Sequence, residues 1–206
     1  MIKAILYDLD GVLVDATEWH YESFNEALNE ICNFEISRLE HIKTFNGLPT
    51  NKKLEILFGQ NRVKKKDFEI IWKLKQKKTN EIIEQTANID EVKQRLHKQT
   101  KSFKKICVTN SIKQTALLML EKTGQLPFID YLISNEDVNK AKPDPEGYLK
   151  AISYLKLNAN ECLIIEDSAK GIEAAKQSKA HVYEVKGYHD VTLENVLKTI
   201  NHFNLR

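Results

Sequence analysis

The first apolar run of the chain ends in two carboxylates. Residues 5–7 read Ile-Leu-Tyr, and Asp8, Leu9, Asp10 and Gly11 follow directly. A short apolar run bounded by turn residues predicts a buried strand. Because an unpaired buried charge costs several kcal/mol, we expect Asp8 and Asp10 to lie at the carboxyl end of that strand. They would there hold a metal ion, a phosphate group or both.

Behind this strand the pattern changes to helical spacing, and no strand is predicted between residue 15 and about residue 86. Three helices are expected: Glu18 to Ile31, a short helix that begins at Thr50 as N-cap and runs toward Gly59, and Asp67 to about Gln85. The sequence therefore predicts an all-helical domain over residues 16–87, inserted directly after the first strand.

From residue 88 onward, strands and helices alternate. Strands are predicted at 104–109, 131–133, 161–165 and 181–185. Helices are predicted around Ile89, Val92 and Leu96, and at 113–123, 146–155, 169–178 and 191–203. Short connections between alternating strands and helices indicate a parallel sheet that is covered on both faces. We predict an α/β fold whose three-layer core comprises residues 1–15 and 88–206.

Composition narrows the class of protein. Hydrophobic residues make up 42% of the 206 residues and charged residues 29%, which is typical of a soluble globular protein, and the formal charge of +2 does not indicate a polyanion-binding protein. Three widely spaced cysteines form no metal motif or disulfide framework, and we expect Cys107 and Cys162 to be buried. The N-terminal apolar segment is too short for a signal or membrane span. We expect a cytoplasmic monomer that binds neither nucleic acid nor membrane.

Polar residues follow three of the predicted strands. Asp8 and Asp10 end the first, residues 109–111 (Thr-Asn-Ser) end the second, and residues 166–168 (Glu-Asp-Ser) end the fourth. The carboxyl ends of parallel strands share one edge of a sheet, where ligands bind. Four carboxylates there require a cation, and oxygen ligands without His or Cys favour Mg²⁺ over zinc. Each segment alone is typical of a turn, a helix N-cap or a loop, whereas their coincidence at strand ends indicates a site.

Four sequence motifs, in a fixed order along the chain, indicate a resemblance to a known protein family. They are DLDGVLVD at residues 8–15, VTNS at 108–111, KPDP at 142–145 and IIEDSAKGIEAA at 164–175. With them the sequence resembles the haloacid dehalogenase-like superfamily of phosphohydrolases, in the branch with a small helical cap, over essentially its whole length. The resemblance implies a Rossmann-like core and a cap that closes over the active site, expels water and selects the substrate.

The resemblance also implies the roles of the carboxylates. Asp8 would be the nucleophile that forms an aspartyl-phosphate, and Asp10 the general acid/base. Asp8, the Asp10 carbonyl, Glu166 and Asp167 would hold Mg²⁺. An aspartate rather than a serine two residues after the nucleophile favours phosphate chemistry over dehalogenation.

Three further residues would handle the phosphoryl group. By the same resemblance, Thr109 and Asn110 would hold the transferring group. Lys142, from the KPDP loop, would neutralise charge on the nucleophile and the phosphate.

Within the branch the chain is similar to β-phosphoglucomutase and to phosphoglycolate-type phosphatases. His20 and Lys77 fall where the mutase has a cap histidine and lysine, but the mutase arginine after the cap-loop glycine is here Leu48, after Gly47. We interpret the basic residues at 62–66 and 73–78 mainly as a solvated helical face. Attraction of an anionic substrate by Lys77 is the second interpretation, and nucleic-acid binding is the third.

The missing arginine favours a hydrolase, since a mutase must hold a bisphosphate by both ends. We therefore predict a Mg²⁺-dependent phosphatase that hydrolyses a small phosphorylated metabolite through an aspartyl-phosphate. The alternatives are a phosphosugar mutase that uses the same residues and a non-catalytic protein that only binds a phosphorylated ligand.

Overall fold

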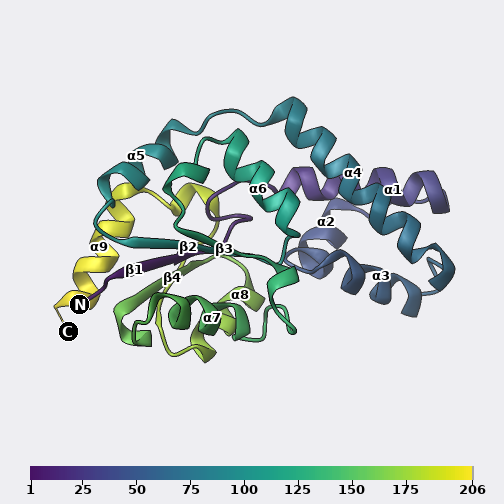
Figure 1. Ribbon diagram of the computed structural model, residues 1–206. Coiled ribbons are helices and arrows are strands. Elements are labelled where there is room, and N and C mark those ends of the chain that lie inside the picture. Colours follow the sequence, from purple (N-terminus) through teal and green to yellow (C-terminus); the bar gives the residue numbers. More distant parts are fainter. Residues whose placement is uncertain (206) are drawn as a thin grey trace. The chain divides into compact units, whose positions relative to one another are not determined.

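A computed structural model describes residues 1–205 and divides the chain into two compact units (Figure 1). The α/β unit comprises Met1–Asp15 and the chain from Asn88 onward, and the helical unit comprises Ala16–Ala87. Each unit has its own apolar core. None of the helices within residues 1–205 is long and apolar enough to span a membrane.

The α/β unit is built on a five-stranded parallel sheet in the order β3-β2-β1-β4-β5. The strands are β1 (Ala4–Tyr7), β2 (Lys104–Val108), β3 (Tyr131–Ile133), β4 (Cys162–Glu166) and β5 (His181–Glu184). Strand β1 lies in the centre, where Ala4 pairs with Lys104 on one side and with Cys162 on the other. All four of its residues are buried, as expected for a strand with neighbours on both edges and helices on both faces.

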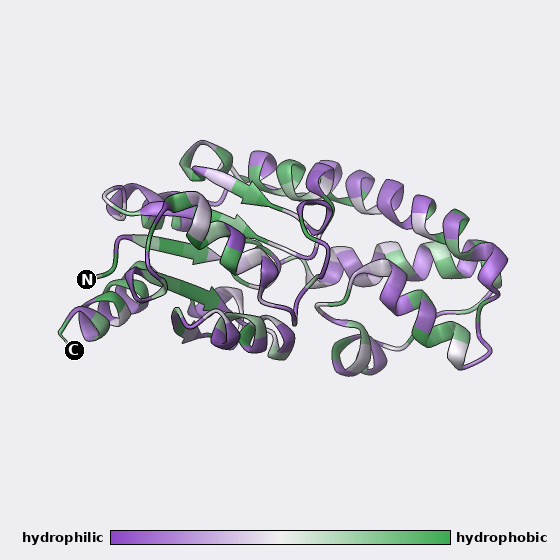
Figure 2. Cartoon of the chain, turned by 60° about the horizontal axis from the view of Figure 1, so that its bottom comes forward, coloured by the Kyte–Doolittle hydropathy of each residue, from purple (hydrophilic) through white to green (hydrophobic). Residues whose placement is uncertain are grey.

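Helices cover both faces of this sheet, so the unit has three layers (Figure 1). Their bounds are α5 (Glu91–Gln99), α6 (Lys113–Lys122), α7 (Glu146–Leu155), α8 (Ala169–Gln177) and α9 (Leu193–Asn204). On one face Leu6 packs in a core with Tyr148 of α7 and Ala174 of α8. On the other, the ring of Tyr7 meets His97 of α5 edge-on at 5.7 Å. Most strand residues are apolar (Figure 2), although β2 begins with Lys104 and Lys105 and β5 reads His-Val-Tyr-Glu.

The helical unit has a separate core. Its elements are α1 (Thr17–Cys32), α2 (Arg38–Glu40), the π-helical turn η1 (His41–Phe45), α3 (Thr50–Gly59), the turn η2 (Lys65–Asp67) and α4 (Phe68–Thr86). Phe24, Phe45, Leu54 and Ile71 are fully buried in it. The sequence prediction missed α2 and η1, which are too short for a helical period. It was also wrong about Thr50, which lies inside α3, where its hydroxyl accepts a hydrogen bond from Gln76 rather than capping the helix.

The predicted fold class is confirmed, and the predicted strands and longer helices all form within a few residues of their expected bounds. Of Ile89, Val92 and Leu96, which marked helix α5 in the sequence, Leu96 alone is buried. Val92 is 63% exposed, whereas Leu96 and Lys93 are buried. The Lys93 ammonium donates to the backbone carbonyls of Tyr188 and Val191, at 2.9 and 3.0 Å, which compensates for its burial. Cys107 and Cys162 are buried and unpaired, as expected.

Candidate active site

The turn after β1 places Asp8 and Asp10 at the carboxyl edge of the sheet. The carbonyl oxygen of Leu9 accepts hydrogen bonds from the backbone N–H groups of residues 12–14, which closes the turn tightly. Gly11 has φ +85°, a left-handed conformation that favours glycine. A Cβ at Gly11 would also overlap the carboxyl group of Asp167, so the glycine keeps space for that side chain.

Lys142 is buried between two carboxylates. Its ammonium donates to Asp8 Oδ1 and Glu166 Oε1, each at 2.6 Å, and to the carbonyl of Val108 at 2.8 Å. Burial alone would lower the pKa of Lys142, but the charges of Asp8 and Glu166 outweigh it and raise this pKa above its usual value. The lysine therefore stays charged and fixes the orientation of the Asp8 carboxylate.

Glu166 ends β4 and is fully buried. Besides Lys142, it accepts a hydrogen bond from the Tyr148 hydroxyl at 2.5 Å. A Cβ at Gly171 in the first turn of α8 would overlap the Glu166 carboxyl group, so this glycine creates the space that the carboxylate occupies. Sequence analysis did not single out Tyr148, because it lies on the buried face of α7 and resembles an ordinary core residue.

Asp10 is oriented by hydroxyl groups at the end of β2. Ser111 Oγ donates to Asp10 Oδ2 at 2.9 Å, and Thr109 Oγ1 lies 3.4 Å from the same oxygen. Sequence reasoning gave Ser111 no role, although it closes the VTNS motif. The structure thus brings Asp10 together with the polar end of β2, while Asp8 contacts Lys142.

Asn110 is engaged with the backbone of Lys142. Its Nδ2 donates to the Lys142 carbonyl at 3.3 Å, and its Oδ1 accepts from the Lys142 N–H at 3.0 Å. The amide side chain therefore positions the lysine loop in this structure.

The acidic residues fit a cation. Oxygen atoms of Asp8, Glu166 and Asp167 lie within 4.8 Å of one another. Asp167 Oδ1 is buried and has no hydrogen-bond partner among the described residues. Burial and, to a smaller extent, the negative charges of Glu166 and Asp10 together raise the pKa of Asp167 to about 7. Burial also raises the pKa of Asp8, and the charge of Glu166 acts in the same direction. A cation would relieve this repulsion, and an all-oxygen donor set suits Mg²⁺. The Asp10 carboxylate lies outside the group of three.

In the helical unit, the structure pairs His20 with Lys75 rather than with Lys77. Lys75 is buried and its Nζ lies 3.1 Å from His20 Nδ1. Lys77 is 70% exposed and forms a surface ion pair with Glu81 at 3.7 Å. Two residues correspond to about 200° around a helix, so the two lysines point in nearly opposite directions. The basic run at 73–78 gave no way to choose between them.

His41 adds to this basic cluster. It is 1% exposed, and neither ring nitrogen has a hydrogen-bond partner among the described residues. Burial lowers its pKa to about 3, and the nearby charges of Lys53, His20 and Lys75 act in the same direction. The helical unit thus gathers several basic side chains around one neutral histidine, although the sequence indicated no role for His41.

The carboxyl edge of the parallel sheet carries buried carboxylates and a buried lysine, an arrangement that defines an α/β enzyme with an acidic active site. Residues 5–185 match the family model described as haloacid dehalogenase-like hydrolase. The chain therefore belongs to the haloacid dehalogenase-like hydrolase family, as the four motifs predicted.

Relatives with curated names cover most of the chain. The chain is 28% identical over 178 residues to "Pyrophosphatase PpaX" of Bacillus velezensis, covering 86% of this chain and 80% of that protein. It is 26% identical over 196 residues to "Phosphoglycolate phosphatase" of Nitrosospira multiformis, covering 92% and 86%. The expected enzyme class, a phosphatase of this family, agrees with these names.

The fold is also shared with solved structures. β-Phosphoglucomutase from Clostridium difficile superimposes with a TM-score of 0.83 at 20% identity and covers 100% of both chains. At 20% identity this similarity establishes the fold and does not distinguish a mutase from a phosphatase.

Proposed function

We propose that this protein is a Mg²⁺-dependent phosphatase that hydrolyses a small phosphorylated metabolite through an aspartyl-phosphate on Asp8. The observation that carries the proposal is the buried contact of Asp8 Oδ1 with the Lys142 ammonium at 2.6 Å, beside the acidic residues Glu166 and Asp167. The names of the relatives support the reaction class.

In the first step, an oxygen of the Asp8 carboxylate attacks phosphorus and forms a new P–O bond. The bond between phosphorus and the ester oxygen breaks, and Asp10 gives its proton to that oxygen, so that the product leaves as a neutral alcohol. Lys142 holds the Asp8 carboxylate in place and neutralises part of the charge that gathers on the phosphoryl oxygens.

In the second step, Asp10 takes a proton from water as the water oxygen attacks phosphorus. The P–O bond to Asp8 breaks, which releases inorganic phosphate and restores the Asp8 carboxylate. Ser111 and Thr109 orient Asp10 for both proton transfers. Mg²⁺, held by Asp8, Glu166 and Asp167 with the Asp10 carbonyl, would supply positive charge that offsets the phosphate oxygens.

Substrate recognition is assigned to two groups of residues. Thr109, Asn110 and Lys142 would hold the phosphoryl group. His20 and Lys75 of the helical unit would contact the rest of the metabolite, with Lys75 in place of the expected Lys77, because Lys75 is the one that contacts His20. We further propose that the protein is cytoplasmic and monomeric. We also propose that the helical unit acts as a cap.

The test measures phosphate release from an aryl phosphate and from a panel of phosphorylated metabolites. We expect Asp8→Asn to abolish turnover with an unchanged circular dichroism spectrum, and chelation of Mg²⁺ to do the same reversibly. Asp15→Asn is the matched control, since Asp15 is exposed and lies in the same segment.

Three outcomes would contradict the proposal. Turnover by Asp8→Asn comparable with the native protein would exclude the aspartyl-phosphate. Isomerisation of glucose 1-phosphate with a bisphosphate primer, without phosphate release, would instead identify a mutase. Failure of every phosphate ester to turn over would leave the binding-protein alternative.

A further inference from the structure

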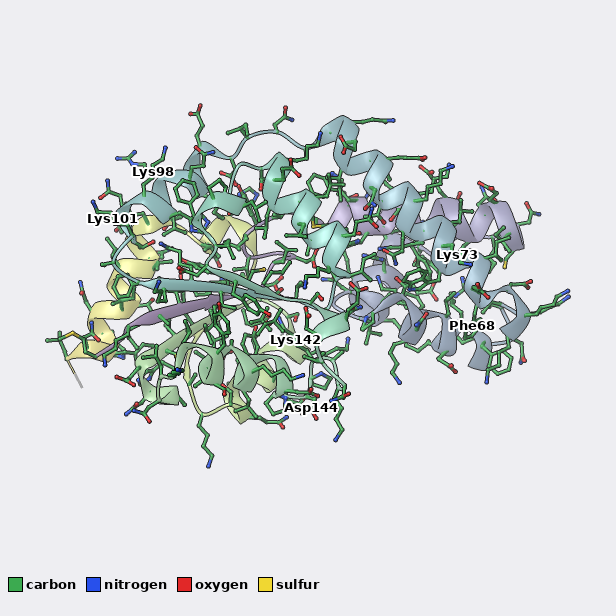
Figure 3. All side chains as sticks on the ribbon, in the orientation of Figure 1. Phe68, Lys73, Lys98, Lys101, Lys142 and Asp144 are labelled. Carbon is green, nitrogen blue, oxygen red and sulfur yellow. The ribbon has the colours of Figure 1, made fainter. Side chains whose placement is uncertain are left out.

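A cavity of about 520 Å³ lies in the α/β unit at the end of the sheet where β2 begins, opposite the active site. Lys104, in its wall, begins β2 and pairs with Ala4 at the start of β1, whereas Asp8 follows the end of β1. Four residues of extended chain place these two edges about 13 Å apart. Figure 3 shows Lys98 and Lys101, which also line the cavity, at the end of the unit away from Lys142. The cavity is therefore separate from the catalytic residues.

The lining of this cavity is strongly basic. Lys98, Lys101, Lys104 and Lys105 all contribute to it, and Asp130 is the single acidic residue among its lining residues. Asp130 is already engaged by the Lys104 ammonium at 3.1 Å and by the backbone N–H of Lys105 at 2.7 Å. Four positive charges against one negative charge leave an excess of three, which attracts anions.

Lys105 is the most unusual of these lysines. It is 4% exposed, and the one carboxylate of the lining, Asp130, forms its ion pair with Lys104, at 3.1 Å. Burial lowers the pKa of Lys105, and the charge of Asp130 opposes this only in part. Because Lys105 lines the cavity and its ammonium is not fully enclosed by the fold, a charged ligand can reach it. An anion in the cavity would supply the missing counter-charge.

Aromatic side chains form another part of the wall. Phe103 and Phe128 are each half-buried and line the cavity. The Phe128 ring stacks on His97 at 5.4 Å with an interplanar angle of 15°. His97 is fully buried, its Nε2 pairs with Gln125 Oε1 at 3.1 Å, and its Nδ1 has no partner in the described part of the chain. Half-exposed phenyl rings are surfaces on which a planar ring can stack.

We propose that this cavity is a binding site for a nucleoside diphosphate or a closely similar compound, with phosphate groups attached to a planar ring. The lysines bind the phosphates as charge-assisted donors, and Phe103 and Phe128 contact the ring. Its volume lies within the range of small-molecule sites. The proposal does not depend on the phosphatase reaction, because none of these residues contacts Asp8.

The experiment measures ADP binding by isothermal titration calorimetry. All proteins carry Asp8→Asn, so that ADP is not consumed. We compare Lys98→Gln/Lys101→Gln with the control Lys156→Gln/Lys186→Gln, which removes the same charge from exposed positions elsewhere on the unit. Loss of two contacts to phosphate should weaken ADP binding about 10-fold or more, whereas the control should stay within about twofold.

Two further measurements sharpen the result. Lys105→Met should also weaken ADP binding while raising the free energy of unfolding, since it removes a buried charge at similar volume. Adenosine and inorganic pyrophosphate should each bind more weakly than ADP, because each lacks half of the recognised groups. Absence of ADP binding at millimolar concentration, or equal Kd values for the test and control variants, would overturn the proposal. Binding of pyrophosphate as tight as that of ADP would overturn the role of the aromatic wall.

Discussion

Substitution of Gly171 by alanine tests the packing of the candidate active site most directly. Replacing a helical glycine by alanine normally stabilises a protein by up to about 1 kcal/mol, because alanine loses less conformational freedom on folding. Here the added Cβ meets three atoms of the Glu166 carboxyl group, all far inside the 3.4 Å at which ordinary van der Waals contact begins. The carboxylate is the group expected to move, because it ends a flexible side chain, whereas the α8 backbone is held by the hydrogen bonds of the helix.

The cost follows from the contacts that Glu166 makes. Moving it separates a buried ion pair with Lys142 and a hydrogen bond from Tyr148. Breaking a buried ion pair costs about 3–5 kcal/mol, from which the helical gain of about 1 kcal/mol is subtracted. We expect Gly171→Ala to lower the free energy of unfolding by about 2–4 kcal/mol and to lower kcat/KM about 10- to 100-fold.

The matched control is Gly59→Ala. Gly59 is the last residue of α3, and a Cβ there would meet nothing within 4 Å. This variant should gain up to about 1 kcal/mol in stability. Urea unfolding followed by circular dichroism gives both values, and turnover of an aryl phosphate gives the activity. If Gly171→Ala were as stable and as active as Gly59→Ala, the placement of Glu166 against α8 would be wrong.

Three further predictions use the same assays. Ser111→Ala removes the 2.9 Å hydrogen bond to Asp10 and should lower kcat about 10-fold or more, with little change in urea midpoint; an unchanged kcat would refute this positioning role. Lys75→Gln should raise KM for the best metabolite of the panel about 10-fold, and Lys77→Gln should raise it less than twofold. A larger effect of Lys77→Gln would instead identify Lys77 as the lysine that contacts the substrate. Burial lowers the pKa of His97 from 6.5 to about 4, so folding favours the neutral ring. The contribution of His97 to the free energy of unfolding is fully present above pH 6.5 and is lost as the pH falls toward 4. Between pH 7 and pH 5, the free energy of unfolding of the wild-type protein should therefore fall by about 2 kcal/mol more than that of His97→Gln. Equal losses would contradict the burial of a neutral ring.

Local sequence was sufficient for the order of elements and for most of the catalytic residues. Alternating apolar runs specified the strands, and the polar residues at their ends marked Asp8, Asp10, Thr109 and Glu166. This information is local because a strand or helix period is set by neighbouring residues. The parallel sheet then followed from short connections, which place strand ends on one edge.

Contacts between distant residues required the tertiary structure. It decides that Lys142 bridges Asp8 and Glu166, that Tyr148 donates to Glu166, and that Lys75 meets His20. No pattern within a segment encodes these contacts, because each depends on how two elements far apart in sequence pack together.

The same reason explains the basic cavity at the other edge of the sheet. In the sequence, residues 98–105 are four lysines with three polar residues and one phenylalanine, a stretch with no evident motif. The fold buries Lys105 at the start of β2, brings Phe128 and Asp130 beside it, and leaves Lys98 and Lys101 exposed at the rim. The sequence by itself thus determined the family, the sheet and the acidic strand ends. Only tertiary packing decided which side chains meet, since burial and pairing of charges depend on the whole fold.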